Sequence, residues 1–137
     1  MNSKRKDLDT WILLLLGVAM LANALWMFAG PMHWYQEVPA AVPDTGPFNP
    51  HFVRDIGCAF FAAGVALVWG ARSAAYRFPL VVSATVFLAA HALLHIYDTS
   101  VGNLPSDHWW IDFAGVYLPV ILLGFVLWRL QPRATHD

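Results

Sequence analysis

Two histidines and an aspartate interrupt one of the most apolar stretches of this sequence. In residues 89–98 (AAHALLHIYD), His91, His95 and Asp98 stand at positions i, i+4 and i+7. On a helix, this spacing places the three side chains on one face. Two imidazoles four residues apart can bind one metal ion, and a carboxylate one turn further on can add an oxygen ligand. The stretch therefore predicts a polar pocket within an apolar helix, and a metal ion is one candidate to occupy it.

Other polar residues could complete this site. Asp55, Asp112 and His51 are the candidates for a four- or five-coordinate centre. Mixed nitrogen and oxygen ligation suits a divalent transition metal such as Zn, Mn or Fe better than Cu(I), which prefers sulfur. Haem is disfavoured, because its axial histidines usually come from two helices and only the segment with His91 and His95 carries histidines at depth. A hydrogen-bonded network that joins the helices without any metal is the open alternative.

Three further residues are candidate ligand-binding groups. Arg54 should pair with a nearby carboxylate or orient an anionic ligand, because an isolated cation in an apolar environment is costly. His51 lies one turn before Asp55, and Asn23 stands inside the first apolar stretch. His108, which comes just before the last apolar stretch, is assigned to the membrane interface.

The composition identifies the class of protein that must position these groups. Of 137 residues, 58% are hydrophobic and only 12% are charged, about half the charged share of a soluble domain. The single cysteine excludes an internal disulfide and any cysteine-based zinc motif. The net charge of -1 and the lack of a recognisable motif exclude a nucleic-acid partner. The composition therefore indicates a membrane protein.

Four segments are long and apolar enough to cross a bilayer as helices, which takes about 20 residues. They cover about residues 10–30, 51–71, 78–97 and 109–130. Continuous apolar runs of this kind lack the alternation of a membrane β-barrel. We therefore expect an all-α integral membrane protein, with residues 1–137 forming one four-helix transmembrane bundle.

The positive charges predict the orientation of this bundle. Seven of the eight Lys and Arg residues fall on one side of the predicted spans: Lys4, Arg5, Lys6, Arg72, Arg77, Arg129 and Arg133. The positive-inside rule makes that side, and with it both termini, cytoplasmic. A cleaved signal peptide ending at Ala22-Asn23-Ala24 is the alternative, but the apolar run continues to Ala29, which favours an uncleaved first span.

Features of individual segments add detail to this picture. The proline-rich and aromatic residues 31–50 predict an ordered outer loop without regular helix, lying as a lid over the bundle. Pro119 should kink the fourth span. Small residues of the second span, including Gly57 and Gly64, indicate close packing against a neighbouring helix.

Several of these motifs also occur together elsewhere. The chain resembles a group of short bacterial inner-membrane proteins of unassigned function that carry W-Y-x-x-V-P, T-G-P-F-N-x-H-F-V-R-D-I-G and H-x-x-x-H in that order. Here these motifs lie at Trp34 to Pro39, Thr45 to Gly57, and His91 to His95. The resemblance implies four helices in the bacterial cytoplasmic membrane and no known activity. More loosely, the architecture resembles the DoxX-like four-helix proteins, some of which are quinone-linked oxidoreductase subunits.

The leading functional hypothesis is an outward-facing His/Asp pocket that binds a divalent metal or a small polar ligand, for redox chemistry or metal handling. The alternatives are an accessory subunit whose polar network is only structural, and a quinone- or lipid-binding oxidoreductase component. The sequence predicts contact with the lipid bilayer. It leaves open whether the chain is an enzyme and whether it pairs with another membrane protein or with a second copy.

Overall fold

The computed structural model describes residues 3–131. All regular secondary structure in that range is helical. The elements are α1 (Ser3–Ala29), α2 (Pro31–Glu37), η1 (Val42–Thr45), α3 (Pro50–Arg72), α4 (Arg77–Val101), α5 (His108–Ile111), η2 (Phe113–Tyr117) and α6 (Leu118–Leu130). Four segments are long and apolar enough to cross a membrane: Leu8–Ala29, Pro50–Arg72, Arg77–Val101 and Phe113–Leu130. The predicted all-helical fold with four candidate membrane spans is confirmed.

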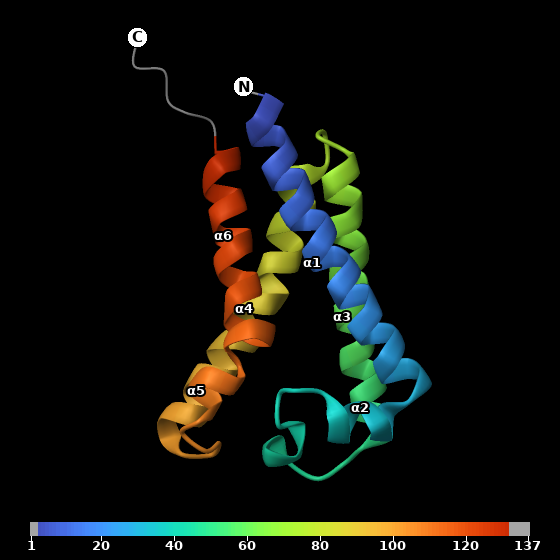
Figure 1. The fold of residues 1–137 in the computed structure, drawn as a ribbon, viewed down its shortest axis with the longest axis vertical. Helices are drawn as coiled ribbons and strands as arrows, with labels where there is room; N and C mark the ends of the chain where they lie inside the picture. Colours follow the sequence, from blue (N-terminus) through green and yellow to red (C-terminus); the bar gives the residue numbers. More distant parts are fainter. Residues whose placement is uncertain (1–2, 132–137) are drawn as a thin grey trace.

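The long helices run up and down, so that α1 begins and α6 ends at the same end of the bundle (Figure 1). We call this end the terminal end. At the opposite end lie α2, η1 and α5, and we call it the loop end (Figure 1). The surface between the two ends is apolar, with side chains such as Leu15, Val86 and Leu93 about two-thirds exposed. Such an outward-facing surface suits contact with lipid.

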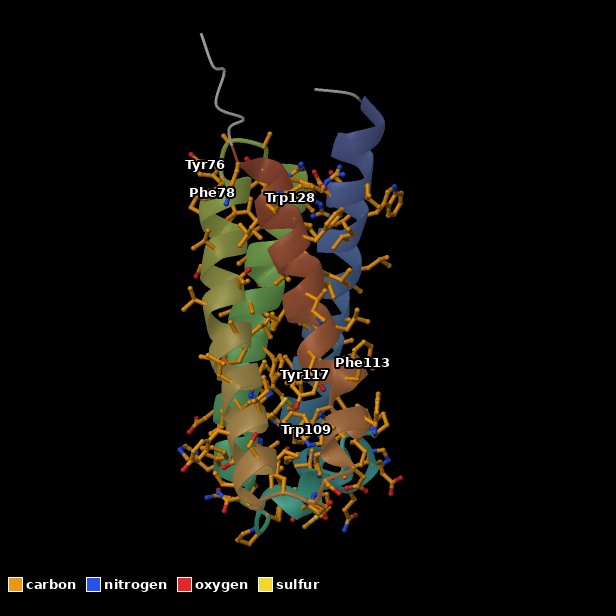
Figure 2. The ribbon with its side chains drawn as sticks, turned by 90° about the vertical axis from the view of Figure 1, so that its left-hand side faces the viewer. Tyr76, Phe78, Trp109, Phe113, Tyr117 and Trp128 are labelled. Carbon is orange, nitrogen blue, oxygen red and sulfur yellow. The ribbon has the colours of Figure 1, made fainter. Side chains whose placement is uncertain are left out.

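Aromatic side chains mark both ends of the apolar surface. Tyr76, Phe78 and Trp128 gather at the terminal end, and Trp109 and Phe113 lie toward the loop end (Figure 2). All five side chains are exposed. Aromatic belts of this kind are typical of the two membrane–water interfaces.

The closest helix pair is α1 with α3. A Cβ atom added to Gly64 would lie 2.8 Å from Cγ of Leu21 and 2.9 Å from the carbonyl oxygen of Gly17. A Cβ atom at Gly57 would lie 2.8 Å from the ring of Phe28. These contacts leave no room for a side chain, so the small residues of the second span do pack closely against a neighbour, as the sequence predicts.

Two arginine side chains join helices at the terminal end. The buried guanidinium of Arg77 donates hydrogen bonds to the carbonyls of Gly70 (2.8 Å) and Ala71 (2.7 Å) and to Oγ1 of Thr10 (3.1 Å). Nε of Arg129 lies 2.6 Å from Oδ1 of Asp9. Arg77 thus joins α4 to α3 and α1, and Arg129 joins α6 to α1. Two cations that indicate the cytoplasmic side in the sequence are structural groups as well.

The connection between α1 and α3 contains more regular structure than its prolines predict. Pro31 occupies the first turn of α2, where a missing backbone N–H removes no helical hydrogen bond. Nε1 of Trp34 donates to Oδ1 of Asn23 (2.8 Å), which fixes α2 against α1. The hydroxyl of Tyr35 then donates to the carbonyl of Gly46 (2.7 Å), which ties α2 to the chain after η1.

The fourth predicted span is not one continuous α-helix. Between α5 and α6 the backbone forms η2, a π-helical turn, in which the carbonyl of Asp112 accepts hydrogen bonds from the amides of both Val116 (2.8 Å) and Tyr117 (3.2 Å). Pro119 follows directly in the first turn of α6 and has no N–H to donate. The wide turn accommodates this missing donor, and it places Asp112 at the junction of two helical segments.

Candidate metal centre

Three polar residues meet inside the loop end of the bundle. His95 comes from the last third of α4, His108 begins α5, and Asp112 directly follows α5. His108 and Asp112 are four residues apart, so one helical turn places them on the same face. Both side chains are fully buried, and the side chain of His95 is 14% exposed.

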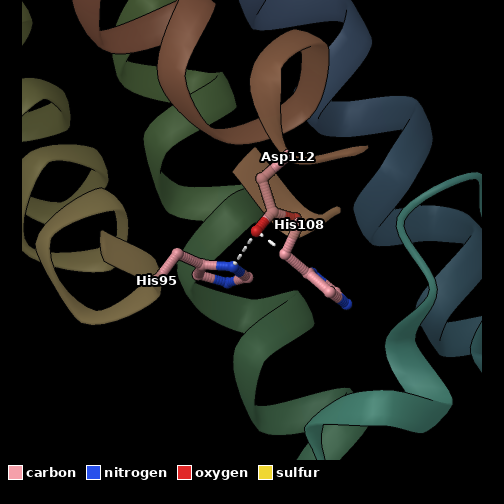
Figure 3. Close-up of side chains that lie close together, drawn as sticks. All are labelled: His95, His108 and Asp112. Atoms are coloured by element: carbon pink, nitrogen blue, oxygen red, sulfur yellow. Dashed lines mark hydrogen bonds and ion pairs between the residues drawn. The ribbon is translucent and has the colours of Figure 1, made fainter. Parts of the chain in front are cut away.

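The three side chains converge on one oxygen atom. Nδ1 of His95 lies 2.8 Å from Oδ2 of Asp112, and Nδ1 of His108 lies 3.2 Å from the same oxygen. Figure 3 shows the contacts of this oxygen with both imidazoles, His95 from α4 on one side and His108 from α5 on the other. Two imidazole nitrogens and a carboxylate oxygen therefore lie together in a largely buried site.

The other oxygen of this carboxylate has no partner. Oδ1 of Asp112 is buried without a hydrogen bond in the structure, as are Oγ1 of Thr99 and the hydroxyl of Tyr117. Thr99 lies one turn after His95 on α4, and Tyr117 ends the π-turn that follows Asp112. Most buried polar atoms in proteins are hydrogen-bonded, and a buried charge without partners is costly. The site therefore lacks at least one favourable contact for its carboxylate.

His108 is placed between two carboxylates. Its Nε2 lies 3.2 Å from Oδ2 of Asp44, a residue of η1, while its Nδ1 faces Asp112. A neutral imidazole carries one proton and can donate to only one of these acceptors. Both contacts can be satisfied together when an additional proton or a metal ion lies between the ring and one of the carboxylates.

The donor set and its spacing fit a metal ion. The ligand atoms of His95, His108 and Asp112 all lie within 4.8 Å of one another. Zinc binds nitrogen and carboxylate oxygen at about 2.0–2.2 Å, so its ligand atoms are roughly 3.4 Å apart in a tetrahedral site. Only small side-chain movements separate the observed positions from that geometry. Two imidazoles and one carboxylate suit Zn, Mn or Fe.

The structure brings together two of the residues that the sequence proposes as ligands, His95 and Asp112. His91 lies beside them, with its ring centroid 4.6 Å from that of His95. Its ring packs against Phe60 and Phe87, and it is not one of the three residues whose ligand atoms lie within 4.8 Å of one another. His91 is therefore a neighbour of the centre and not one of its converging groups.

The remaining candidates lie elsewhere. Oδ1 of Asp98 accepts a hydrogen bond from Asn103 (2.9 Å) at the exposed end of α4. His51 and Asp55 form an exposed pair on α3, with Nε2 3.3 Å from Oδ2. These contacts give both carboxylates other partners, and neither belongs to the group of converging ligand atoms.

Arg54 and Asn23 have other partners as well. Nε of Arg54 donates a hydrogen bond to the carbonyl of Phe28 (3.4 Å), and among the described residues the expected ion pair with a carboxylate is absent. The side chain is exposed, so water can solvate it. Asn23 binds Trp34, as described above, and so serves the packing of α2.

Two residues of the centre do not follow from the sequence pattern, His108 and Asp44. His108 stands in a polar stretch before an apolar run, which suggests the interface, yet its side chain is fully buried. The spacing His108-x-x-x-Asp112 is the signal that pairs it with a carboxylate. Asp44 lies 64 positions from His108 in a proline-rich connection, and no local pattern predicts their contact.

Comparison of this chain with protein-family models, with curated proteins and with solved structures gives no match.

Proposed function

We propose that this protein binds a divalent transition metal ion through His95, His108 and Asp112. The observation that carries the proposal is the fully buried Asp112 carboxylate, which faces two imidazole nitrogens at 2.8 and 3.2 Å and leaves its second oxygen without a partner. A divalent cation would neutralise the carboxylate and bind to the nitrogen and oxygen atoms that now contact one another.

We further propose that the loop end, and with it the metal centre, faces away from the cytoplasm of a bacterial cell, in its cytoplasmic membrane. The support is the concentration of Lys and Arg residues at the other end of the spans. In this orientation the ion exchanges with the extracytoplasmic side. Binding metal at such a position suits a role in redox chemistry or in metal handling.

The number of ligands bears on the chemistry. Structural zinc sites use four protein ligands, whereas catalytic sites use three and leave one position open. His95, His108 and Asp112 supply three. The open position would let the ion hold a water molecule or a small polar ligand, polarise it and lower its pKa.

A purely structural role is the second candidate, and one observation favours it. The contact of Asp112 with His95 joins α4 to the α5–η2 segment, and its contact with His108 lies within that segment. The terminal end is joined in the same manner by Arg77 and by the Asp9–Arg129 pair, with no need for a metal. A hydrogen-bonded network could therefore hold the loop end in the same way.

Metal content and thermal stability distinguish these functions. The protein, purified without a histidine tag, is analysed for bound metals and then melted with and without added Zn²⁺, Mn²⁺ or Fe²⁺. We expect wild type to contain a transition metal and to melt at a higher temperature when metal is added. The variants His95→Gln, His108→Gln and Asp112→Asn should lose most of the metal and the thermal shift.

Two variants serve as controls. His51→Gln removes an exposed imidazole outside the centre, and His91→Gln removes one that lies beside the centre without belonging to its ligand group. Both should retain the metal. A wild-type protein that contains no metal and shows no thermal shift with any of the three ions would rule out metal binding and leave the structural network as the function.

A further inference from the structure

The connection between α1 and α3 reaches the metal centre through a single carboxylate. We propose that residues 38–48 form a lid, and that Asp44 is the positioning residue through which a bound metal ion locks this lid over the centre. The inference rests on the metal site proposed above. It adds that metal binding and the closure of this lid are coupled.

The first step concerns how the chain presents Asp44. The residue lies in η1, where its amide donates to the carbonyl of Ala41 (2.9 Å) and Oγ1 of Thr45 donates to the carbonyl of Val42 (2.7 Å). These contacts fold the segment into a short turn. The side chain of Asp44 is 43% exposed, yet its Oδ2 lies 3.2 Å from Nε2 of the fully buried His108. It thus joins the surface to the centre.

The second step concerns the protons of His108. A metal ion at Nδ1 requires that this nitrogen carry no proton, which leaves the single proton of the neutral ring on Nε2. Nε2 then donates to Asp44 while Nδ1 binds the ion, so that one form of the ring satisfies both partners. Metal-bound histidines commonly donate their second N–H to a carboxylate in this way, which fixes the ring and makes it a better ligand.

The third step concerns what else holds the lid. Tyr35 anchors one side of it by donating to the carbonyl of Gly46. Toward α4, α5 and η2, the Asp44–His108 contact is the single hydrogen bond or ion pair that the described part of the chain provides. Ala41 has a left-handed backbone with φ 45°, a conformation that persists only where surrounding contacts enforce it. A metal ion that fixes His108 therefore strengthens the contact that holds the lid closed.

The test compares Asp44→Asn, Asp44→Glu and wild type. Zn²⁺ affinity is measured by competition with a chelator, and Co²⁺ absorption spectra report the geometry of the ligands. Asp44→Asn should weaken Zn²⁺ binding by about 10- to 100-fold and change the Co²⁺ spectrum, and Asp44→Glu should recover part of the loss. Asp107→Asn is the matched control, because it removes an exposed carboxylate beside His108 and should bind Zn²⁺ as wild type does.

The lid itself is followed by hydrogen–deuterium exchange of residues 38–48. Zn²⁺ should slow exchange in wild type and in Asp107→Asn, but have little effect in Asp44→Asn. Wild-type affinity in Asp44→Asn, or equal slowing of its exchange by Zn²⁺, would overturn the lid proposal while the metal site stands. A wild type that does not bind Zn²⁺ or Co²⁺ would overturn the metal site, and the lid proposal with it.

Discussion

The buried guanidinium of Arg77 completes the hydrogen bonding of carbonyls at the end of α3. The last carbonyls of a helix have no partner within the helix, and a cation there also interacts favourably with the helix dipole. Arg77 meets Gly70 and Ala71 in this way and reaches Thr10 of α1 as well. One side chain therefore links three helices at the terminal end.

Replacing this side chain should destabilise the whole bundle. Arg77→Met removes charged hydrogen bonds in a buried position, and we expect a loss of about 3 kcal/mol in the free energy of unfolding. The measurement is denaturation in detergent. The exposed Arg72 provides the control, since Arg72→Met removes the same charge from the same end and should have little effect. Equal destabilisation by the two substitutions would contradict a structural role for Arg77.

At the level of single residues, the sequence predicts those groups of the centre that interrupt apolar runs. His95 and Asp112 are conspicuous because ionisable residues in membrane spans are costly and tend to face the interior. His91 satisfies the same rule, but its ring is accommodated by Phe60 and Phe87. The rule locates the polar region of the bundle, whereas only side-chain geometry separates ligands from neighbours.

The packing of α1 against α3 depends on the absence of side chains at the contact. Gly64→Ala would place a methyl group against Leu21 and the backbone of Gly17. We expect a loss of roughly 1–3 kcal/mol in stability, as for other overpacked contacts. Gly124→Ala is the matched control, because nothing lies within 4 Å of the added atom in α6. If both variants melt like wild type, the two helices are not closely packed.

The π-turn before α6 allows a test in which stability and metal binding diverge. Pro119→Ala restores a backbone N–H, so an ordinary α-helical turn can compete with η2. This change would rotate Asp112 relative to α6, and we expect weaker Zn²⁺ binding without lower thermal stability. Chelator competition and thermal denaturation of the same samples measure the two effects. Unchanged affinity would show that the π-turn does not position Asp112.

Helix boundaries illustrate what a linear pattern leaves undetermined. The three continuous long helices follow from their apolar runs. Pro119 predicts an irregularity in the fourth membrane-spanning helix. The extra residue of the π-turn, however, depends on how Asp112 and its carbonyl are placed in three dimensions. Similarly, Pro31 disfavours helical backbone at the residue before it and not in the residues after it, so α2 is compatible with a proline-rich segment.

The orientation of the whole molecule is open to direct measurement. In a Cys58→Ser background, a membrane-impermeant maleimide should label Asn103→Cys from outside intact cells, and Ala74→Cys only after the membrane is opened. Both positions are exposed, and they lie at opposite ends of α4. The expectation follows from the charge bias. Labelling of a cysteine at position 3 from outside would contradict the proposed orientation.

The return of α6 to the end where α1 begins has a consequence for how such a chain could grow in evolution (Figure 1). Two copies fused in tandem would enter the membrane in the same direction, because the first copy ends where the second must begin. Many transporters are instead built from inverted repeats, whose halves have opposite directions in the membrane. A fused pair of this chain could acquire that symmetry only by gaining or losing a membrane-spanning helix between its halves.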